Sequence, residues 1–130
     1  MKSKNINLIV FNDYTTTYCA IANGGSLITY KHLANRQAGS HLVPTIASVF
    51  ETAGYSLHDC SYIVAHRGPA PFTTLRAVIT TVNGLSFASQ IPLVGVDGMY
   101  VLAQQTDISK CDYILVLLNA FRKDVYYGLY

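Results

Sequence analysis

The sequence has few charged residues, few cysteines and no long apolar run, and each shortage excludes a class of protein. Charged residues make up 12% of the chain and hydrophobic residues 51%, a balance that disfavours intrinsic disorder. The nine basic residues are scattered rather than gathered in a stripe, so direct nucleic-acid binding by this chain alone is not expected. A composition this apolar also favours an apolar surface that a partner protein covers.

The cysteines and apolar runs indicate a cytoplasmic protein without a membrane anchor. Cys19, Cys60 and Cys111 are far apart and form no C-x-x-C pair, so neither a disulfide framework nor a zinc cluster is indicated. We therefore expect a reduced, cytoplasmic protein. The longest apolar run, residues 113–118, is too short to span a bilayer, and no signal-peptide pattern is found.

Two patterns typical of metal and nucleotide chemistry are also missing. His32, His41, His58 and His66 include no pair four residues apart, the spacing that places two imidazoles on one helical face. We expect them on the surface or in turns, with no metal site. The segment from Asp13 to Thr17 lacks the glycine that lets a loop backbone approach phosphate closely. Asp13 is therefore predicted to cap a turn.

A hydrolase of the serine type is not indicated either. Ser40 and His41 are adjacent on a predicted helix, where neighbouring side chains should diverge. No G-x-S-x-G elbow is present. No catalytic residue is predicted.

The hydrophobic periodicity predicts alternating strands and helices. Strands are expected over residues 6–11, 15–22, 27–32, 62–65, 93–96, 113–118 and 125–130. Helices are expected over residues 40–54, 71–89 and about 97–105. Asn23-Gly24-Gly25 predicts a hairpin turn, and residues 119–124 predict a second one.

Single residues mark the helix ends and the predicted core faces. Pro44 is placed near the start of the first helix, Gly54 just after its end, and Asp97 at the N-cap of the third. The predicted core faces are Leu42, Val43, Ile46, Val49, Phe50 and Ala53 on the first helix, and Phe72, Leu75, Ile79, Val82 and Ser86 on the second.

The order βββαβαβα followed by ββ predicts an α/β fold with a mixed sheet and helices packed on it. That order is the ribonuclease-H-like lobe of the actin-like ATPase and sugar-kinase architecture. Residues 1–108 are interpreted as this N-terminal lobe. Residues 109–130 are interpreted as the first strands of a second lobe that is mostly missing.

The turn between the fourth strand and the second helix carries the most specific motif. It reads R-G-P-A-P-F-T-T-L-R over residues 67–76, and N-G-L (83–85), I-P-L-V-G-V (91–96) and N-A…D-V-Y (119–126) follow in order. Together with Asp13, these segments resemble the TsaB family of bacterial tRNA threonylcarbamoyladenosine biosynthesis proteins, which are glycoprotease-like and M22-peptidase-like. The chain departs from the family pattern at Ala70, Pro71, Thr74, Asn119 and Phe121.

The resemblance implies a non-catalytic subunit that binds and stabilises the catalytic subunit TsaD and works with the ATPase TsaE. Such a complex installs N6-threonylcarbamoyladenosine at position 37 of tRNAs that read codons beginning with A. ATP and metal are expected in the partner subunit and no cofactor in this chain. Contact with tRNA is expected only through the complex. In the family, the two long helices form a bundle with those of TsaD or of a second copy.

The residues expected at that partner interface lie on the two helices: Leu42, Ile46, Phe72, Leu75, Arg76, Thr80 and Gly84. The small residues among them could instead pack within the chain. Arg67, Gly68 and Pro69 are expected to form a rigid bracket that aims the second helix. Arg67 and Arg76 could meet a partner's carboxylates or a phosphate. Alternatively, Arg67 could brace the turn while Arg76 lies on the solvated face of the helix. The alternatives are an ATP-binding phosphotransferase or M22-type peptidase of the same fold, and a self-associating homodimer.

Overall fold

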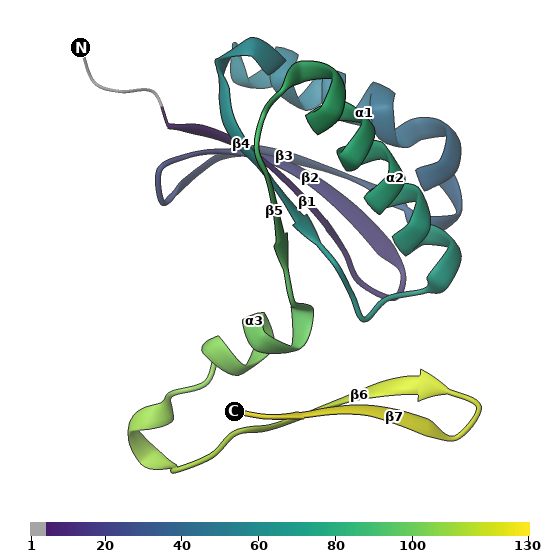
Figure 1. Cartoon of the computed structure of the whole chain (residues 1–130), viewed down its shortest axis with the longest axis vertical. Coiled ribbons are helices and arrows are strands. Elements are labelled where there is room, and N and C mark those ends of the chain that lie inside the picture. The colour runs from purple at the N-terminus through teal and green to yellow at the C-terminus, as the bar shows by residue number, and fades with distance from the viewer. Residues whose placement is uncertain (1–4) are drawn as a thin grey trace.

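The computed structural model describes residues 5–130, apart from the side chain of Ile108, and its elements follow the predicted order. The elements are β1 (Ile6–Asn12), β2 (Thr16–Asn23), β3 (Ser26–Ala34), α1 (Ala38–Ala53), β4 (Cys60–His66), α2 (Phe72–Ser89), β5 (Leu93–Val96), α3 (Gly98–Gln104), β6 (Leu115–Phe121) and β7 (Asp124–Leu129) (Figure 1). Three single-turn 3₁₀ helices lie between them, at Asn35–Gln37, Leu57–Asp59 and Ile108–Lys110.

The first five strands form one mixed sheet in the order β3-β2-β1-β4-β5. The meander β1-β2-β3 is antiparallel, whereas β4 pairs in parallel with both β1 and β5. Crossovers between parallel strands run through helices, as the βαβ geometry requires. The predicted ribonuclease-H-like lobe is thus confirmed.

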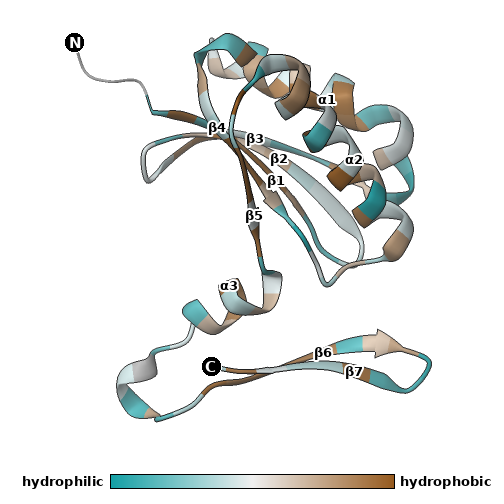
Figure 2. Ribbon diagram, viewed as in Figure 1, coloured by the Kyte–Doolittle hydropathy of each residue, from teal (hydrophilic) through white to brown (hydrophobic). Residues whose placement is uncertain are grey.

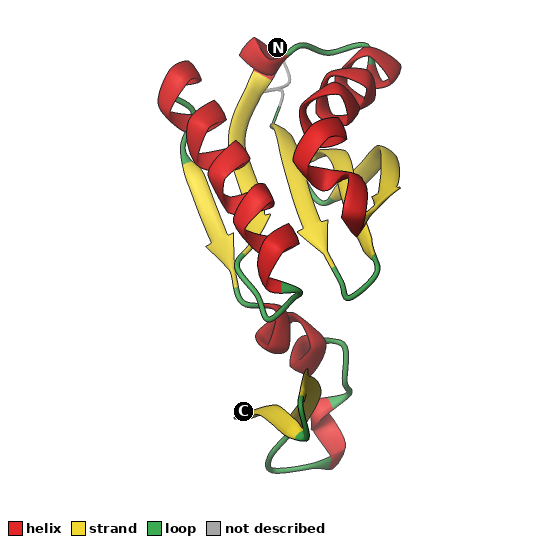
Figure 3. Ribbon diagram, turned by 90° about the vertical axis from the view of Figure 1, so that its right-hand side faces the viewer, coloured by secondary structure: helices red, strands yellow, loops and turns green. Residues whose placement is uncertain are grey.

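Both long helices cover the same face of this sheet (Figure 3). α1 packs on β2 and β3, and α2 packs on β4 and β1. The core between them is made of branched aliphatic side chains, as is typical of central strands buried on one face. Figure 2 shows these apolar residues along β1 and β4. The largest fully buried hydrophobic side chains are Ile6, Leu8, Val10, Ile21, Leu42, Val49, Ile63, Val78 and Val82.

Three predicted boundary residues are where the sequence placed them. Gly54 follows α1 with φ of 72°, a left-handed conformation that glycine adopts without strain. Asp97 caps α3, and its carboxylate accepts hydrogen bonds from the backbone N–H groups of Met99 and Tyr100. Gly24, with φ of 59°, forms the turn between β2 and β3.

Two predictions about the helices are wrong. Pro44 lies inside α1, because the helix begins at Ala38 and not at Ser40. The buried face of α2 consists of Thr74, Val78 and Val82, while Phe72 points outward with 71% of its surface exposed. α2 carries apolar residues on several sides, so periodicity alone does not fix which side meets the sheet.

The last two strands form a separate antiparallel hairpin, which lies beyond α3 and away from the five-stranded sheet (Figure 1). Its turn is tighter than the predicted 119–124 segment, because β6 continues to Phe121. Arg122 and Lys123 form the turn with positive φ of 51° and 71°. Tyr14 connects the hairpin to the end of β1, since its hydroxyl donates to the Asn119 carbonyl at 2.5 Å.

Candidate functional site: a partner surface on the second helix

The turn before α2 is held by backbone and side-chain packing. Gly68 has φ of 108°, and Leu75 approaches to 3.1 Å from where a Cβ on residue 68 would lie. The Gly68 carbonyl accepts a hydrogen bond from the Gly98 N–H at 2.9 Å, and Gly68–Pro69 is a cis peptide. A side chain at residue 68 would thus be both strained and crowded. The Arg67 side chain is exposed beside this turn.

The exposed side of α2 forms one continuous stripe. Phe72, Arg76, Thr80, Gly84 and Phe87 are exposed and follow one another by three or four residues, which places them on one helical face. Phe72 and Phe87, at 71% and 82% exposure, lie at its two ends, and Arg76 and the smaller Thr80 and Gly84 lie between them. We call these five residues the α2 stripe. Small residues in such a position allow another helix to approach closely.

Arg76 belongs to the α2 stripe, on the exposed face of the helix. Its guanidinium carbon lies 5.3 Å from the centroid of the Phe72 ring, within cation–π range. A shallow groove runs beside the stripe, between α2 and the first turn of α1. It is lined by Gly39, Thr73, Arg76, Ala77, Thr80 and Thr81.

Three of the seven residues expected at a partner interface do not reach this surface. Leu42 and Ile46 are buried in the chain's own core with 1% and 4% exposure, so they cannot contact a partner in this conformation. Leu75 is partly buried against Gly68. On α1 the exposed apolar residue is Val43, which the sequence placed in the core.

Phe87 was missed because it falls outside every motif. The signal that could have found it is its spacing of fifteen residues from Phe72, slightly more than four helical turns. Two exposed phenylalanines on one helical face are unusual for a surface that stays in water.

At the end of β1, Asp13 caps a turn as predicted. Its Oδ1 accepts hydrogen bonds from the backbone N–H groups of Thr15 and Thr16, both at 2.7 Å. Partial burial raises the pKa of Asp13, but these hydrogen bonds outweigh it and hold the pKa below its ordinary value. The donors that a phosphate would need are therefore already bound to a carboxylate of the chain itself.

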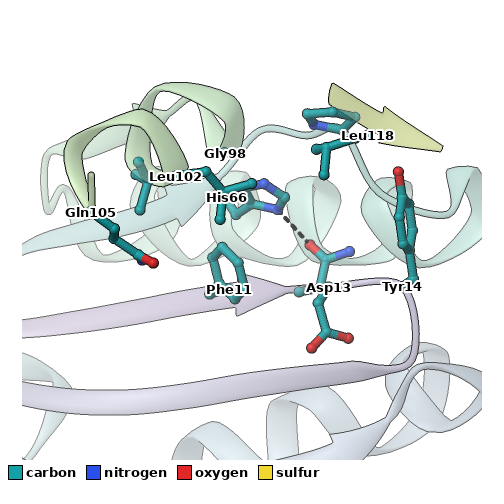
Figure 4. A pocket seen from close by; sticks show the side chains of 11 residues that line it. Phe11, Asp13, Tyr14, His66, Gly98, Leu102, Gln105 and Leu118 are labelled. Carbon is teal, nitrogen blue, oxygen red and sulfur yellow. Dashed lines mark hydrogen bonds between the residues drawn. The ribbon is translucent and has the colours of Figure 1, made fainter. Parts of the chain in front are cut away.

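His66 is buried, which contradicts its predicted place on the surface or in a turn. It ends β4 at 5% exposure, and its Nδ1 lies 3.3 Å from the Asn12 Oδ1 (dashed line in Figure 4). Burial lowers the pKa of His66, while the charge of Asp97 and hydrogen bonds from the imidazole to the backbone of Asn12 and Gly68 act in the opposite direction. The other three histidines are exposed.

Ser40 and His41 contact each other, contrary to expectation. The Ser40 Oγ lies 2.8 Å from the His41 Nδ1, because the two side chains bend toward one another at the first turn of α1. Both are exposed, whereas an activated nucleophile needs a base that a third group orients. Within residues 5–130, no three His, Cys, Asp or Glu side chains gather as metal ligands would.

The β6–β7 hairpin has one covered and one bare face. Val116 and Leu118 pack with Met99 and Ala103 of α3. The residues paired across the strands on the other face are mostly apolar and exposed, and none of them belongs to that small core. This bare face consists of Leu115, Leu117 and Asn119 on β6 with Leu129, Tyr127 and Val125 on β7. In the described part of the chain, no helix is long and apolar enough to cross a membrane.

Comparison with known proteins agrees with the motif and the fold. The TsaB protein of Escherichia coli K12, a "tRNA threonylcarbamoyladenosine biosynthesis protein", is 27% identical over 91% of this chain and 52% of its own length. The TsaB protein of Haemophilus influenzae is 23% identical over 96% of this chain and 54% of its own. The chain thus spans about half the length of these curated relatives.

A solved structure matches as well. "YeaZ from Pseudomonas aeruginosa" superposes with a TM-score of 0.79 at 26% identity, covering 97% of this chain and 59% of that one. The sequence profile of the family described as "TsaD: tRNA N6-adenosine threonylcarbamoyltransferase" matches residues 30–130. The chain belongs to this family, and it is a TsaB-like protein.

Proposed function

We propose that this chain is a non-catalytic scaffold subunit in the biosynthesis of N6-threonylcarbamoyladenosine at position 37 of tRNAs that read codons beginning with A. Its relatives from Escherichia coli and Haemophilus influenzae are named for that pathway. The chain binds and stabilises a TsaD-like catalytic subunit, and a TsaE-like ATPase completes the assembly. ATP and metal bind to the partner, and tRNA is contacted through the complex.

The α2 stripe is the observation that carries this proposal. Two packed helices lie with their axes about 8–10 Å apart, and small side chains at the contact allow the closer approach. Thr80 and Gly84 provide such a stretch, and Phe72 and Phe87 are apolar anchors on either side of it. Aromatic residues, phenylalanine included, are enriched at the cores of protein interfaces relative to the rest of the surface.

The loop after β1 supports the absence of catalysis by this chain. The N–H groups of Thr15 and Thr16 are taken by the Asp13 carboxylate, which would repel a phosphate at the same place. The residues present do not fit a nucleotide phosphate site, and no reaction step is assigned to them.

The hairpin supports the start of a second lobe at residues 109–130. It is a separate sheet from the other five strands, and one of its faces is apolar and exposed. A two-stranded hairpin is marginal in water unless more strands or a helix pack on it. We infer that its bare face packs against further secondary structure in the assembled protein.

Co-elution from a sizing column with the TsaD-like subunit of the same organism tests the proposal. The unchanged chain should co-elute, whereas Thr80→Arg, which places a long charged side chain in the middle of the stripe, should not. Gln104→Arg is the matched control, because residue 104 is exposed on α3 away from the stripe, and it should co-elute normally. Failure of the unchanged chain to co-elute, or normal co-elution of Thr80→Arg, overturns the proposal.

Self-association through the same stripe is the competing outcome. A homodimer would appear in sedimentation of the chain alone as a doubled mass that Thr80→Arg abolishes. A chain that dimerises in this way and ignores the TsaD-like subunit contradicts the scaffold role.

A further inference from the structure

The five-stranded sheet has its two long helices on one face only (Figure 1). Successive side chains of a strand point to opposite faces of a sheet. On β1, Ile6, Leu8 and Val10 belong to the core under the helices, so Ile9 and Phe11 point the other way. We call this second face the open face; α3 lies only at its end, beside Phe11. Parallel strands such as β4 and β5 are usually covered on both faces.

One row of the open face is apolar across all five strands. The register places Ile9 of β1 beside Ala20 of β2 and Val64 of β4, and these lie in turn beside Tyr30 of β3 and Val94 of β5. We call these five residues the sheet row. Its two ends are accessible, since Tyr30 and Val94 are 55% and 46% exposed.

The open face carries no charged side chain. Besides the sheet row, the strand register assigns to it Asn7, Phe11, Tyr18, His32, Tyr62 and Val96. None of these residues is Asp, Glu, Lys or Arg. The absence of Lys and Arg disfavours nucleic acid, which is held through its phosphates. The cores of protein interfaces are depleted in charged residues in the same way.

The two halves of the sheet row differ in size, and this favours a second copy as the partner. β1 is the central strand of the order β3-β2-β1-β4-β5. A two-fold axis along β1, between two open faces, places β3 of one copy over β5 of the other, and β2 over β4. The large Tyr30 then lies over the smaller Val94, and Ala20 lies over Val64. The symmetry makes each of these contacts twice.

We propose that the open face binds a second copy of this chain in a sheet-on-sheet dimer about this axis. Aligned sheets pack with their strands within about 30° of one another, and an axis parallel to β1 satisfies that condition. The open face measures about 24 Å by 20 Å, because its five strands lie about 4.8 Å apart and four of them have at least seven residues. That area approaches the lower bound of stable interfaces, about 600 Å² per partner, so we expect micromolar association.

This inference does not depend on the scaffold role. The α2 stripe belongs to the helix layer, whereas the open face is on the other side of the sheet. Either surface can be occupied while the other stays bare, so the two experiments fail separately.

Sedimentation of the chain alone, up to high micromolar concentration, tests the dimer. The unchanged chain should form a reversible dimer. Tyr30→Asp and Val94→Arg should each weaken it at least about 100-fold, because each buries two unpaired charges at the interface. Both residues are exposed in the single chain, so both variants should fold. An unchanged chain that stays monomeric, or variants that dimerise equally well, overturn the proposal.

Mixing the two variants tests the axis itself. In a dimer of one Tyr30→Asp chain and one Val94→Arg chain, the new carboxylate faces the new guanidinium once, and the second contact is unchanged. The mixture should therefore dimerise although neither variant does alone, and recovery also shows that both are folded. Failure of the mixture to dimerise contradicts the assignment.

Two further variants separate this dimer from other assemblies. Gln104→Arg, exposed on α3, is the matched control and should dimerise normally. Thr80→Arg should also dimerise; loss of the dimer in that variant would assign it to the α2 stripe and overturn the proposal. A monomeric chain whose co-elution with the TsaD-like subunit is lost in Tyr30→Asp would identify that subunit as the occupant of the open face, which also overturns it.

Discussion

The imidazole of His66 occupies the space that a side chain at residue 98 would need. The Nε2 of His66 lies 2.1 Å from the ideal Cβ position of Gly98, well inside any allowed contact. Gly98 also donates its N–H to the Gly68 carbonyl, which ties the start of α3 to the turn before α2. A glycine at residue 98 therefore lets the start of α3 lie against both His66, at the end of β4, and Gly68, in the turn that follows.

Gly98→Ala should destabilise the protein by about 1–3 kcal/mol, the usual cost of overpacking a buried site. The added methyl group must displace the His66 ring, which is itself buried. Gly39→Ala is the control, because nothing lies within 4 Å of a Cβ at residue 39 of α1. Urea unfolding followed by circular dichroism measures both. The prediction is wrong if the two variants are equally stable.

Stability should fall as the pH drops below about 6.5, the ordinary pKa of histidine. Burial holds the pKa of folded His66 below that value. Between the folded and the unfolded pKa, the unfolded chain takes up a proton that the folded chain resists, so acid favours unfolding. At higher pH the imidazole is neutral in both the folded and the unfolded chain, so His66 no longer makes stability depend on pH.

The pH effect is measured as the urea midpoint at several pH values from about 7.5 down to about 5, above the range in which ordinary carboxylates titrate. His66→Gln should flatten the curve in that window. An unchanged slope in His66→Gln would assign the acid sensitivity to other groups.

Much of the fold follows from the sequence because its signals are local. The order of the strands, Gly54 and the Asp97 cap depend on neighbouring residues and were predicted correctly, although β6 begins and ends later than the expected 113–118. The rotation of α2 was not, because apolar residues such as Phe72 and Val78 point in different directions around it. Only packing on the sheet selects which of them is buried.

In the candidate site, too, some features follow from local sequence and others depend on packing. The motif over residues 67–76 located the turn and the helix, but not the exposed stripe that ends at Phe87. The buried pair of Asn12 and His66 joins residues 54 apart in sequence, and no spacing rule connects them. The contact of Ser40 with His41 depends on side-chain rotamers rather than on helix geometry.

Gly84→Ala should separate stability from binding. Alanine favours a helix by about 0.5–1 kcal/mol over glycine, and a Cβ at residue 84 meets nothing within the chain. The variant should therefore unfold at higher urea but bind the TsaD-like subunit more weakly, since the methyl group keeps the partner helix at a distance. Calorimetric titration and urea unfolding on one preparation check both effects. Unweakened binding would exclude Gly84 from the contact.

Replacing Arg122-Lys123 by Asn-Gly should stabilise the β6–β7 hairpin by about 1 kcal/mol, since this pair suits two positive φ angles. Arginine and lysine are strained there, at 51° and 71°. Amide hydrogen exchange of β6 and β7 measures the gain. The control, Gln-Gln at the same positions, removes the charges but keeps the strain. Equal protection in both variants would attribute the effect to charge instead.

The most direct test of the scaffold role is the threonylcarbamoyladenosine content of tRNA, measured by mass spectrometry of nucleosides from a reconstituted reaction. The reaction contains tRNA, an activated threonylcarbamoyl donor, and the TsaD-like and TsaE-like subunits with this chain or a variant. Thr80→Arg should reduce the modification at least ten-fold, because the partner contact is lost. Asp13→Asn should leave it unchanged, because Asp13 only caps a turn. Full modification with Thr80→Arg, or its loss with Asp13→Asn, would contradict a non-catalytic scaffold.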